Sequence, residues 1–436
     1  MLQQQRTFRR AAYGVLISLT GLIGFQLPDD ASFAANTDPG QEAPAELTTL
    51  SLEELMKVEV TSVSKQAQPL FQAAAAVFVI SQEDIRRSGV TTIPEALRMA
   101  PGIQVARLDT HRWAISSRGF NGEFANKLLV LIDGRTVYSP LFSGVFWDAQ
   151  DTVLEDIDRI EVIRGPGASL WGANAVNGVI NVITKKAKDT QGLLAVVGGG
   201  TEERAFTTLR YGTSVGEHTH ARLYGKFSER DDFVRSDGTP GGDDWRNGRG
   251  GFRLDHELSS QDSLTVQGDY YRGSEGFGFV EPLLTTPFSR SVRDRWSYSG
   301  GNILSRWKHA FSNSSSLLVQ TYYDRAERDS RLFTERRDIF DIDLQHSFTW
   351  GQSNRVIWGL GYRFTADHIV NSTTIRTTPT SRVLNLFNGF VQDEFTLIPN
   401  TLAVTAGTKV EHNDFTGWVV QPSGRLRWTP TQTLMF

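Results

Sequence analysis

Alternating apolar and polar residues dominate the chain after Gln191. In residues 264–271, 356–365 and 401–411, one set of alternate positions is mostly apolar and the other mostly polar. Because successive side chains of a strand point to opposite faces, each segment predicts a strand with one apolar face. A membrane barrel with a wet lumen and a soluble β-sandwich share this pattern. Strands of about ten residues or more, with Trp and Tyr near their tips, favour the barrel.

The number of these strands constrains the architecture further. About twelve fit between Gln191 and Phe436, and twelve tilted strands would close around a lumen of only about 15 Å. If residues 67–186, a domain of about 120 residues described below, sit inside the barrel, they need an opening roughly 35 Å wide and therefore about twenty-two strands. Pro430 and the turn-like residues 429–432 argue against a long final strand ending at Phe436. We therefore expect the chain to hold only the N-terminal part of a barrel, truncated at its C-terminal side.

The N-terminus has the features of a secretory signal. Arg6, Arg9 and Arg10 precede an apolar stretch, residues 11–27, and the small residues of 32–34 suit signal peptidase. A permanent anchor helix is the alternative, but about 17 apolar residues lie at the bottom of the membrane-spanning range. We predict cleavage after residue 34 and an exported mature protein.

A short β-prone strip follows a polar leader. Residues 35–57 are rich in Pro, Ala, Glu and Thr and predict a flexible periplasmic segment. Val58, Val60 and Val63 then alternate with polar residues. The strip can be the first strand of the next domain, or an exposed strand that pairs with the sheet edge of another protein.

Residues 67–186 predict a small α+β domain. Ser81 caps a helix that Gly89 ends, and Thr92 caps a second helix with Pro94 in its first turn. Strands are expected at 77–80, 103–105, 113–117, 128–132, 160–163 and 179–183, with a short helix at 154–157.

Composition excludes several classes of function. The chain has no cysteine, which removes disulfides, thiolate catalysis and zinc–thiolate sites. Its 45 Lys+Arg against 49 Asp+Glu give a net charge of −4, which argues against a nucleic-acid partner. No catalytic constellation is recognisable, so we expect neither enzymatic activity nor a cofactor.

Several local motifs suggest binding sites but have simpler interpretations. The glycine clusters at 165–167 and 198–200 lack the spaced Lys-Ser/Thr of a phosphate loop. His218 and His220 have metal-chelating spacing beside a turn, without an evident third ligand. The Asp-rich segment 231–244 could hold calcium, yet it lacks the EF-hand ligand order and is interpreted as a solvated loop. We predict no metal site.

Five ordered segments resemble the plug domain of TonB-dependent outer-membrane receptors. They are 80–89 (ISQEDIRRSG), 93–102 (IPEALRMAPG), 116–120 (SSRGF), 129–135 (LVLIDGR) and 157–184. By this resemblance the chain comprises a signal peptide (1–34), a periplasmic leader (35–57), a TonB-box region (58–66), a plug domain (67–186) and the N-terminal part of a transmembrane β-barrel (190–436).

The resemblance also implies a cellular role. It places the protein in the outer membrane of a Gram-negative cell, as a monomer surrounded by lipid, with its plug facing the periplasm. TonB, energised by ExbB and ExbD in the inner membrane, would drive import of a scarce small molecule. A ferric siderophore is the expected ligand, with cobalamin or another nutrient as the alternative and a non-transporting surface binding protein as a distant one.

The resemblance assigns roles to two groups of residues. The TonB-coupling strip, which departs from the commonest Val-Thr-Ala ending, comprises Val58, Glu59, Val60, Thr61, Ser62 and Val63. Arg118 and Arg164 each precede a glycine in the plug, and Glu394 alternates onto the polar face of a barrel segment. These three residues are expected to lock the plug to the barrel.

Overall fold

The computed structural model describes residues 59–62, 65, 68–70, 73, 75–165, 167–172 and 174–430. The predicted signal peptide and leader, with Val58 and Val63 of the strip, lie outside the described residues. None of the helices in the described part has the length and hydropathy needed to cross a bilayer.

The N-terminal domain, residues 59–190, is built on a mixed five-stranded sheet. Its strand order is β3 (Val77–Ser81), β8 (Ile157–Arg164), β9 (Gly178–Thr184), β6 (Leu128–Ile132) and β7 (Arg135–Thr136), with β6 and β9 parallel. Two further pairs are separate two-stranded sheets, β1 (Glu59–Val60) with β2 (Gln68–Pro69) and β4 (Ile103–Arg107) with β5 (Trp113–Ser117).

Short helices connect these strands, and their ends follow the predicted signals. Helix α3 (Gln82–Ser88) begins with a capping box between Ser81 and Asp84 and ends at Gly89, whose φ of 68° suits glycine. Helix α4 (Ile93–Ala96) is capped by Thr92. The remaining helical turns are η2 (Leu97–Met99), η3 (Leu154–Asp156), α5 (Ala168–Trp171) and η4 (Ala187–Thr190).

The core of the N-terminal domain lies between these helices and the sheet. Ile80 of β3, Ile160 of β8 and Ile180 of β9 are completely buried and pack with Ile93 and Leu97 from the helical segment. Burying an aliphatic side chain of this size stabilises a fold by about 1.5–3 kcal/mol. The domain therefore has a core of its own, which holds the surrounding loops in place.

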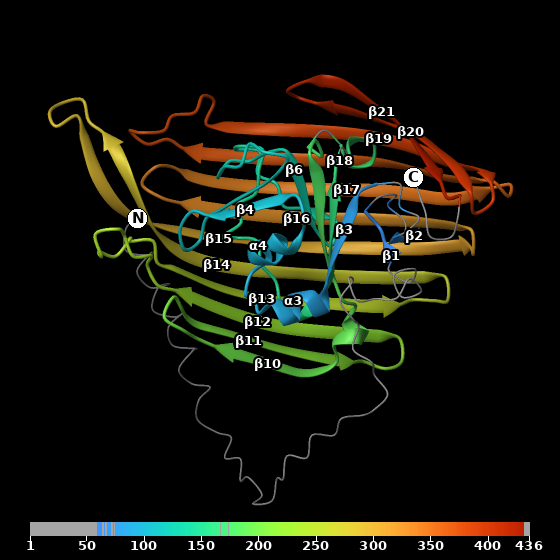
Figure 1. The fold of residues 1–436 in the computed structure, drawn as a ribbon, viewed down its shortest axis with the longest axis horizontal. Coiled ribbons are helices and arrows are strands. Elements are labelled where there is room, and N and C mark those ends of the chain that lie inside the picture. The colour runs from blue at the N-terminus through green and yellow to red at the C-terminus, as the bar shows by residue number, and fades with distance from the viewer. Residues whose placement is uncertain are drawn as a thin grey trace, which may run out of the picture. The chain divides into compact units, whose positions relative to one another are not determined.

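Residues 192–428 form one antiparallel sheet of twelve strands, in sequence order (Figure 1). The predicted number of strands is confirmed. The strands are β10 (Gly192–Gly198), β11 (Glu203–Ser214), β12 (Thr219–Arg230), β13 (Trp245–Glu257), β14 (Asp262–Pro282), β15 (Ser289–Ser312), β16 (Ser315–Asp329), β17 (Thr334–Trp350), β18 (Asn354–Val370), β19 (Ser381–Ile398), β20 (Leu402–Asn413) and β21 (Gly417–Trp428). Among the described strands, β10 and β21 each pair with one neighbour and form the two edges.

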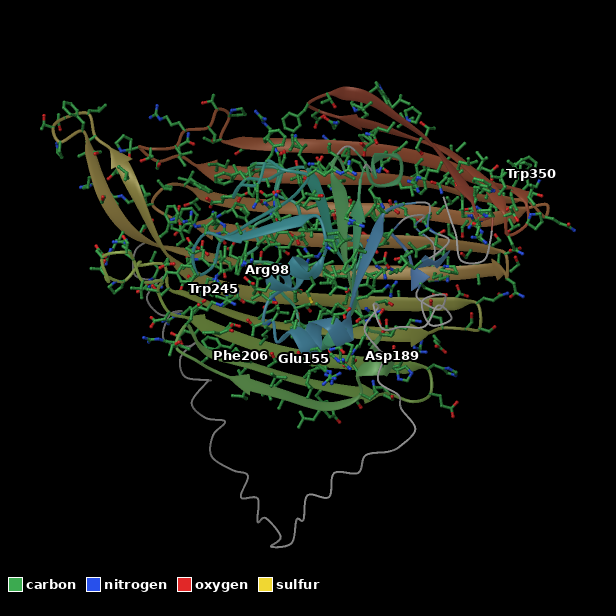
Figure 2. All side chains as sticks on the ribbon, viewed as in Figure 1. Arg98, Glu155, Asp189, Phe206, Trp245 and Trp350 are labelled. Carbon is green, nitrogen blue, oxygen red and sulfur yellow. The ribbon has the colours of Figure 1, made fainter. Side chains whose placement is uncertain are left out.

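The two faces of this sheet differ as the alternation predicts. On β14, Tyr270 is 60% exposed, whereas its neighbour Tyr271 is buried on the face that meets the N-terminal domain. Long loops, including 231–244 and 371–380, join strands at one end, and short turns join them at the other. Figure 2 shows Trp245, at the start of β13, and Trp350, at the end of β17, toward these opposite ends.

Candidate functional site

The predicted coupling strip is docked into the N-terminal domain. Val60 is completely buried against Val79, Leu129 and Ile163, and β1 pairs with β2. The expectation of an exposed strip therefore does not hold for the described state. An apolar side chain at position 60 provides the reason, because leaving it in water costs more than burying it.

A single buried carboxylate fixes the strip's backbone. Glu161 of β8 accepts hydrogen bonds from the amide of Ser62 at 2.7 Å and from the amide of Thr61 at 3.0 Å. The Trp171 indole donates to the Ser62 carbonyl at 2.7 Å, and Arg159 pairs with Glu161 at 2.9 Å. Hydrogen bonds to an ionised acceptor are about twice as strong as neutral ones. Glu161 is thus the strip's principal polar anchor.

Removing this anchor should release the strip. We expect Glu161→Ala to turn a spin label at Glu59→Cys from largely immobile to largely mobile, because lost charge-assisted bonds cost about 2 kcal/mol or more. Glu161→Gln keeps one acceptor and should give an intermediate spectrum. Glu155→Ala, at a half-buried position of η3 with no described ion pair to Arg159 or Glu161, is the control and should leave the spectrum unchanged. An immobile label in Glu161→Ala would show that Val60 alone holds the strip.

The chain after the strip reaches the inner face of the sheet. The Lys65 ammonium lies 4.5 Å from the ring centroid of Phe390 and 5.1 Å from that of Trp171. It also lies 3.8 Å from the Asp343 carboxylate, and Gln345 donates to the Lys65 carbonyl at 3.0 Å. A force applied to the strip would therefore reach the sheet through Lys65 as well as the domain through Glu161.

The predicted lock residues lie apart in the described contacts. Arg118 donates to the backbone carbonyl of Arg164 at 3.5 Å, and Arg164 donates to the Pro101 carbonyl at 3.2 Å. Glu394 lies 3.8 Å from Arg427 on the sheet. Neither arginine meets Glu394 in any described ion pair, so this lock stays a prediction.

The observed junction between domain and sheet has the opposite charge arrangement. Carboxylates of the domain face cations of the sheet, a pattern that the sequence reasoning missed. The ion pairs are Asp148 with Arg328 (2.6 Å), Asp151 with Lys226 (2.7 Å), and Asp156 with Arg210 (3.4 Å) and Arg222 (3.5 Å). Burial raises the pKa of Asp156 despite the arginines beside it. In one further pair the charges are reversed, because Arg135 of the domain pairs with Asp324 of the sheet at 2.6 Å.

Asp133 joins β6, β9 and the sheet at one point. It occupies a left-handed turn with a φ of 50°, and its carboxylate accepts from the Thr184 amide and the Gln267 side chain, both at 2.8 Å. Burial alone would raise the pKa of Asp133, but Arg253 and the Thr184 amide outweigh it, so this pKa lies below its ordinary value. The carboxylate is therefore ionised in the assembled junction.

Acid is expected to weaken this junction through Asp133. A carboxyl with a depressed pKa stabilises the fold fully above its unfolded pKa of about 4, and that contribution is lost as the pH falls through the folded value. Calorimetry on the full-length protein should show the domain melting at a lower temperature at pH 3 than at pH 5. The Asp133→Asn protein should have a lower melting temperature than the unchanged protein at pH 5. Its melting temperature should fall less between pH 5 and pH 3. An equal loss in both proteins would assign the acid sensitivity to other carboxyls.

A cavity of about 1000 Å³ separates the N-terminal domain from part of the sheet. Leu129, Leu131 and Trp171 line one side, and Asp343, Arg363, Lys409 and Glu411 are among the polar residues that line the sheet side. A space of this size can hold a drug-sized molecule. The site thus combines a docked strip, a charged junction and an adjoining cavity.

The Asp-rich segment 231–244 uses its carboxylates on its own backbone. Asp232 accepts from the amides of Asp243 and Asp244 at 2.6 and 2.8 Å. Asp243 also accepts from the Thr110 amide at 3.1 Å, which ties this loop to the N-terminal domain. Over the described residues, no group of three or more His, Asp or Glu side chains is placed to hold a metal ion.

Comparison with known proteins identifies the family to which the two parts of the chain belong. Residues 69–179 match the TonB-dependent receptor plug domain, and residues 195–436 match the TonB-dependent receptor-like β-barrel. The chain belongs to the TonB-dependent receptor family. It is an outer-membrane receptor of a Gram-negative bacterium, from a family of transporters rather than enzymes. The predicted α+β plug followed by antiparallel barrel strands is confirmed, and the N-terminal domain is hereafter the plug and the sheet the wall.

Individual relatives agree with this assignment. The vitamin B12 transporter BtuB of Vibrio vulnificus is 30% identical over 294 residues, which cover 66% of this chain and 43% of the relative. The Vibrio cholerae BtuB is 32% identical over 200 residues, 46% of this chain and 32% of that protein. The chain thus spans less than half the length of these curated relatives.

Solved structures share the fold. The ferripyoverdine receptor of Pseudomonas aeruginosa superposes with a TM-score of 0.65 at 16% identity, covering 85% of this chain and 56% of that one. The siderophore receptor PirA from the same organism gives 0.60 at 20% identity, covering 81% and 59%.

Proposed function

We propose that the full-length protein imports a ferric siderophore across the outer membrane, energised by TonB with ExbB and ExbD. The observation that carries this proposal is the strip at Glu59–Ser62, whose Thr61 and Ser62 amides donate to the Glu161 carboxylate of the plug. An outer membrane has no ATP, so the energy has to arrive as a mechanical pull. TonB would take the strip as an added strand, and the pull would pass to the plug.

The long-loop end of the wall supports a chelate as the ligand. Phe277, Phe279 and Trp296 cluster there, and the guanidinium of Arg112 from the plug lies 4.8 Å from the Phe277 ring centroid. Aromatic faces suit a ligand that carries flat groups. The Arg112 guanidinium is itself paired with Asp109 and Glu123, so it orients the Phe277 ring by a cation–π contact. Iron chelates with flat oxygen-donor groups fit such a cluster.

Cobalamin is the second candidate. The curated relatives at 30–32% identity are described as vitamin B12 transporters. Uptake should be measured in a strain that lacks this receptor, with and without the full-length gene, for radiolabelled ferric chelates and cobalamin. We expect energy-dependent uptake of a ferric chelate. Uptake of cobalamin alone would show that cobalamin, and not a siderophore, is the ligand. If neither compound accumulates and ligand stays at the cell surface, the protein is a binding protein without transport activity.

A further inference from the structure

Five cations line the inner faces of β12 and β13, and we call them the cation ladder. Its members are Arg222, Lys226, Arg230, Arg249 and Arg253. The register places Lys226 directly opposite Arg249, and Arg222 directly opposite Arg253. The four arginines are 4–6% exposed, and the Lys226 side chain is 8% exposed. The plug therefore covers two cross-strand pairs of cations and a fifth cation, Arg230, at the end of β12.

Such an arrangement is unfavourable within the sheet itself. Like charges directly opposite each other on neighbouring strands destabilise the pairing. The wall supplies partial compensation, because Asp269 pairs with Arg249 at 2.6 Å, Asp255 with Arg253 at 2.9 Å, and Glu203 of β11 with Arg230 at 3.4 Å. It supplies Lys226 and Arg222 with no described carboxylate partner.

The plug provides what the wall lacks. Asp151 pairs with Lys226 at 2.7 Å, and Asp156 lies 3.5 Å from Arg222. The backbone carbonyls of Thr110 and Lys185 accept from Arg230 at 3.1 Å and from Arg222 at 2.8 Å. Acidic and carbonyl oxygens of the plug thus occupy the positions that an anionic ligand would take.

The ladder extends along most of the length of β12. Arg230 ends β12 beside the long loop 231–244, and Arg222 lies near the short turn at the other end of that strand. Four residues separate successive rungs on β12, so the spacing is about 13 Å. When the neighbouring plug segment moves away, Lys226 and Arg222 lose their counter-charges and face the opened space.

Another part of the wall pairs its inward-facing cations with its own carboxylates. On β17 and β18, Arg363 pairs with Asp341 at 2.9 Å and Arg337 with Glu335 at 3.2 Å, both pairs within the wall. Moving the plug would leave these pairs intact. The ladder is therefore a local feature of β12 and β13, and β18 offers a control surface.

We propose that the cation ladder is an anion-binding track, exposed by plug displacement, and that the transported ligand is an anion that passes along it. This inference rests on the proposed transport function and narrows the ligand to a negatively charged chelate. In the resting state, the plug carboxylates Asp151 and Asp156 stand in for that ligand. Where the ligand takes the place of these carboxylates, the charge pairing of the wall is conserved.

Thiol labelling of the purified full-length receptor tests the ladder without any transported ligand. Ser228→Cys lies between Lys226 and Arg230 on the inner face, and Thr365→Cys on β18, where the wall pairs its own cations, is the matched control; both native residues are 6% exposed. Anionic sulfonatoethyl and cationic trimethylammonioethyl methanethiosulfonate are applied. Each rate is divided by the rate of the same reagent with a small thiol in solution, because the cationic reagent is intrinsically the more reactive. It is then divided by the corresponding ratio for neutral methyl methanethiosulfonate, which corrects for how often the plug opens.

We expect the anionic reagent to label Ser228→Cys at least about fivefold faster than the cationic one, and to show no such preference at Thr365→Cys. Adding Lys226→Gln should reduce the ratio at Ser228→Cys by about fivefold. Equal rates, a preference for the cation, or a ratio unaffected by Lys226→Gln would overturn the ladder. The proposed function fails by a different result, absence of energised uptake, which the labelling ratio does not measure.

Discussion

Replacing Arg328 by methionine is expected to weaken the attachment of the plug to the wall more than any change at an exposed position. Arg328 donates to Asp148 of the plug at 2.6 Å and to Glu275 of β14 at 2.9 Å, and both carboxylates are buried. Its guanidinium also lies 4.1 Å from the Phe146 ring centroid. Methionine fills much of the volume but leaves two buried carboxylates without their cation. Breaking a buried pair in this way costs about 3–5 kcal/mol.

The effect of Arg328→Met should be visible in two measurements on the full-length receptor. Calorimetry should show a plug transition at lower temperature, and cells should admit a large antibiotic that intact outer membranes exclude. Arg325→Met is the control on the same strand, because Arg325 is 53% exposed and pairs with Asp338 at 3.2 Å. An exposed pair contributes about 0–1 kcal/mol. Equal melting temperatures and equal antibiotic entry in the two variants would show that Arg328 does not stabilise the junction.

Val60→Pro is expected to abolish uptake while ligand still binds at the cell surface. Proline has no backbone N–H and fixes φ, so the strip could neither pair with β2 nor add as a regular strand to TonB. Binding and accumulation of one radiolabelled ligand should be measured in the same cells. Normal accumulation in Val60→Pro would place the coupling segment elsewhere in the chain.

Val60→Ala is the matched variant for this experiment. The strip pattern alone predicts a nearly silent change, because side chains matter little in backbone pairing. The structure alters that expectation, since Val60 is completely buried and its truncation should loosen the docked strip by about 1–2 kcal/mol. Transport should persist, because the backbone donor remains. Loss of transport in Val60→Ala equal to that in Val60→Pro would argue that plug packing, rather than strand addition, is being measured.

Local signals explain how much of the fold was predictable. The cap at Ser81 and the left-handed stop at Gly89 depend on neighbouring residues, and the structure confirms both. The alternation of apolar and polar positions likewise predicted the wall strands. The parallel pairing of β6 with β9 was not predicted, because those strands are more than forty residues apart and no local pattern specifies their partner.

The candidate site was harder to predict for the same reason. Asp148 and Arg328 are 180 residues apart, and every polar residue on an inner strand face looks alike in sequence. Glu161 did carry a signal that was missed: it stands between Ile160 and Val162 in an apolar strand, where a buried charge requires partners. Its partners proved to be the strip's own amides, Thr61 and Ser62.

The most direct test of the account is disulfide trapping between the strip and TonB. Thr61→Cys in the full-length receptor would be combined with a series of single-cysteine TonB variants, in cells with and without a proton gradient. The 436-residue sequence contains no native cysteine, so the introduced thiol has no competitor within it. The account predicts cross-links at alternate TonB positions along one strand edge, as strand addition requires, and their loss in Val60→Pro. Absence of any cross-link during active uptake, or cross-links that persist in Val60→Pro, would contradict it.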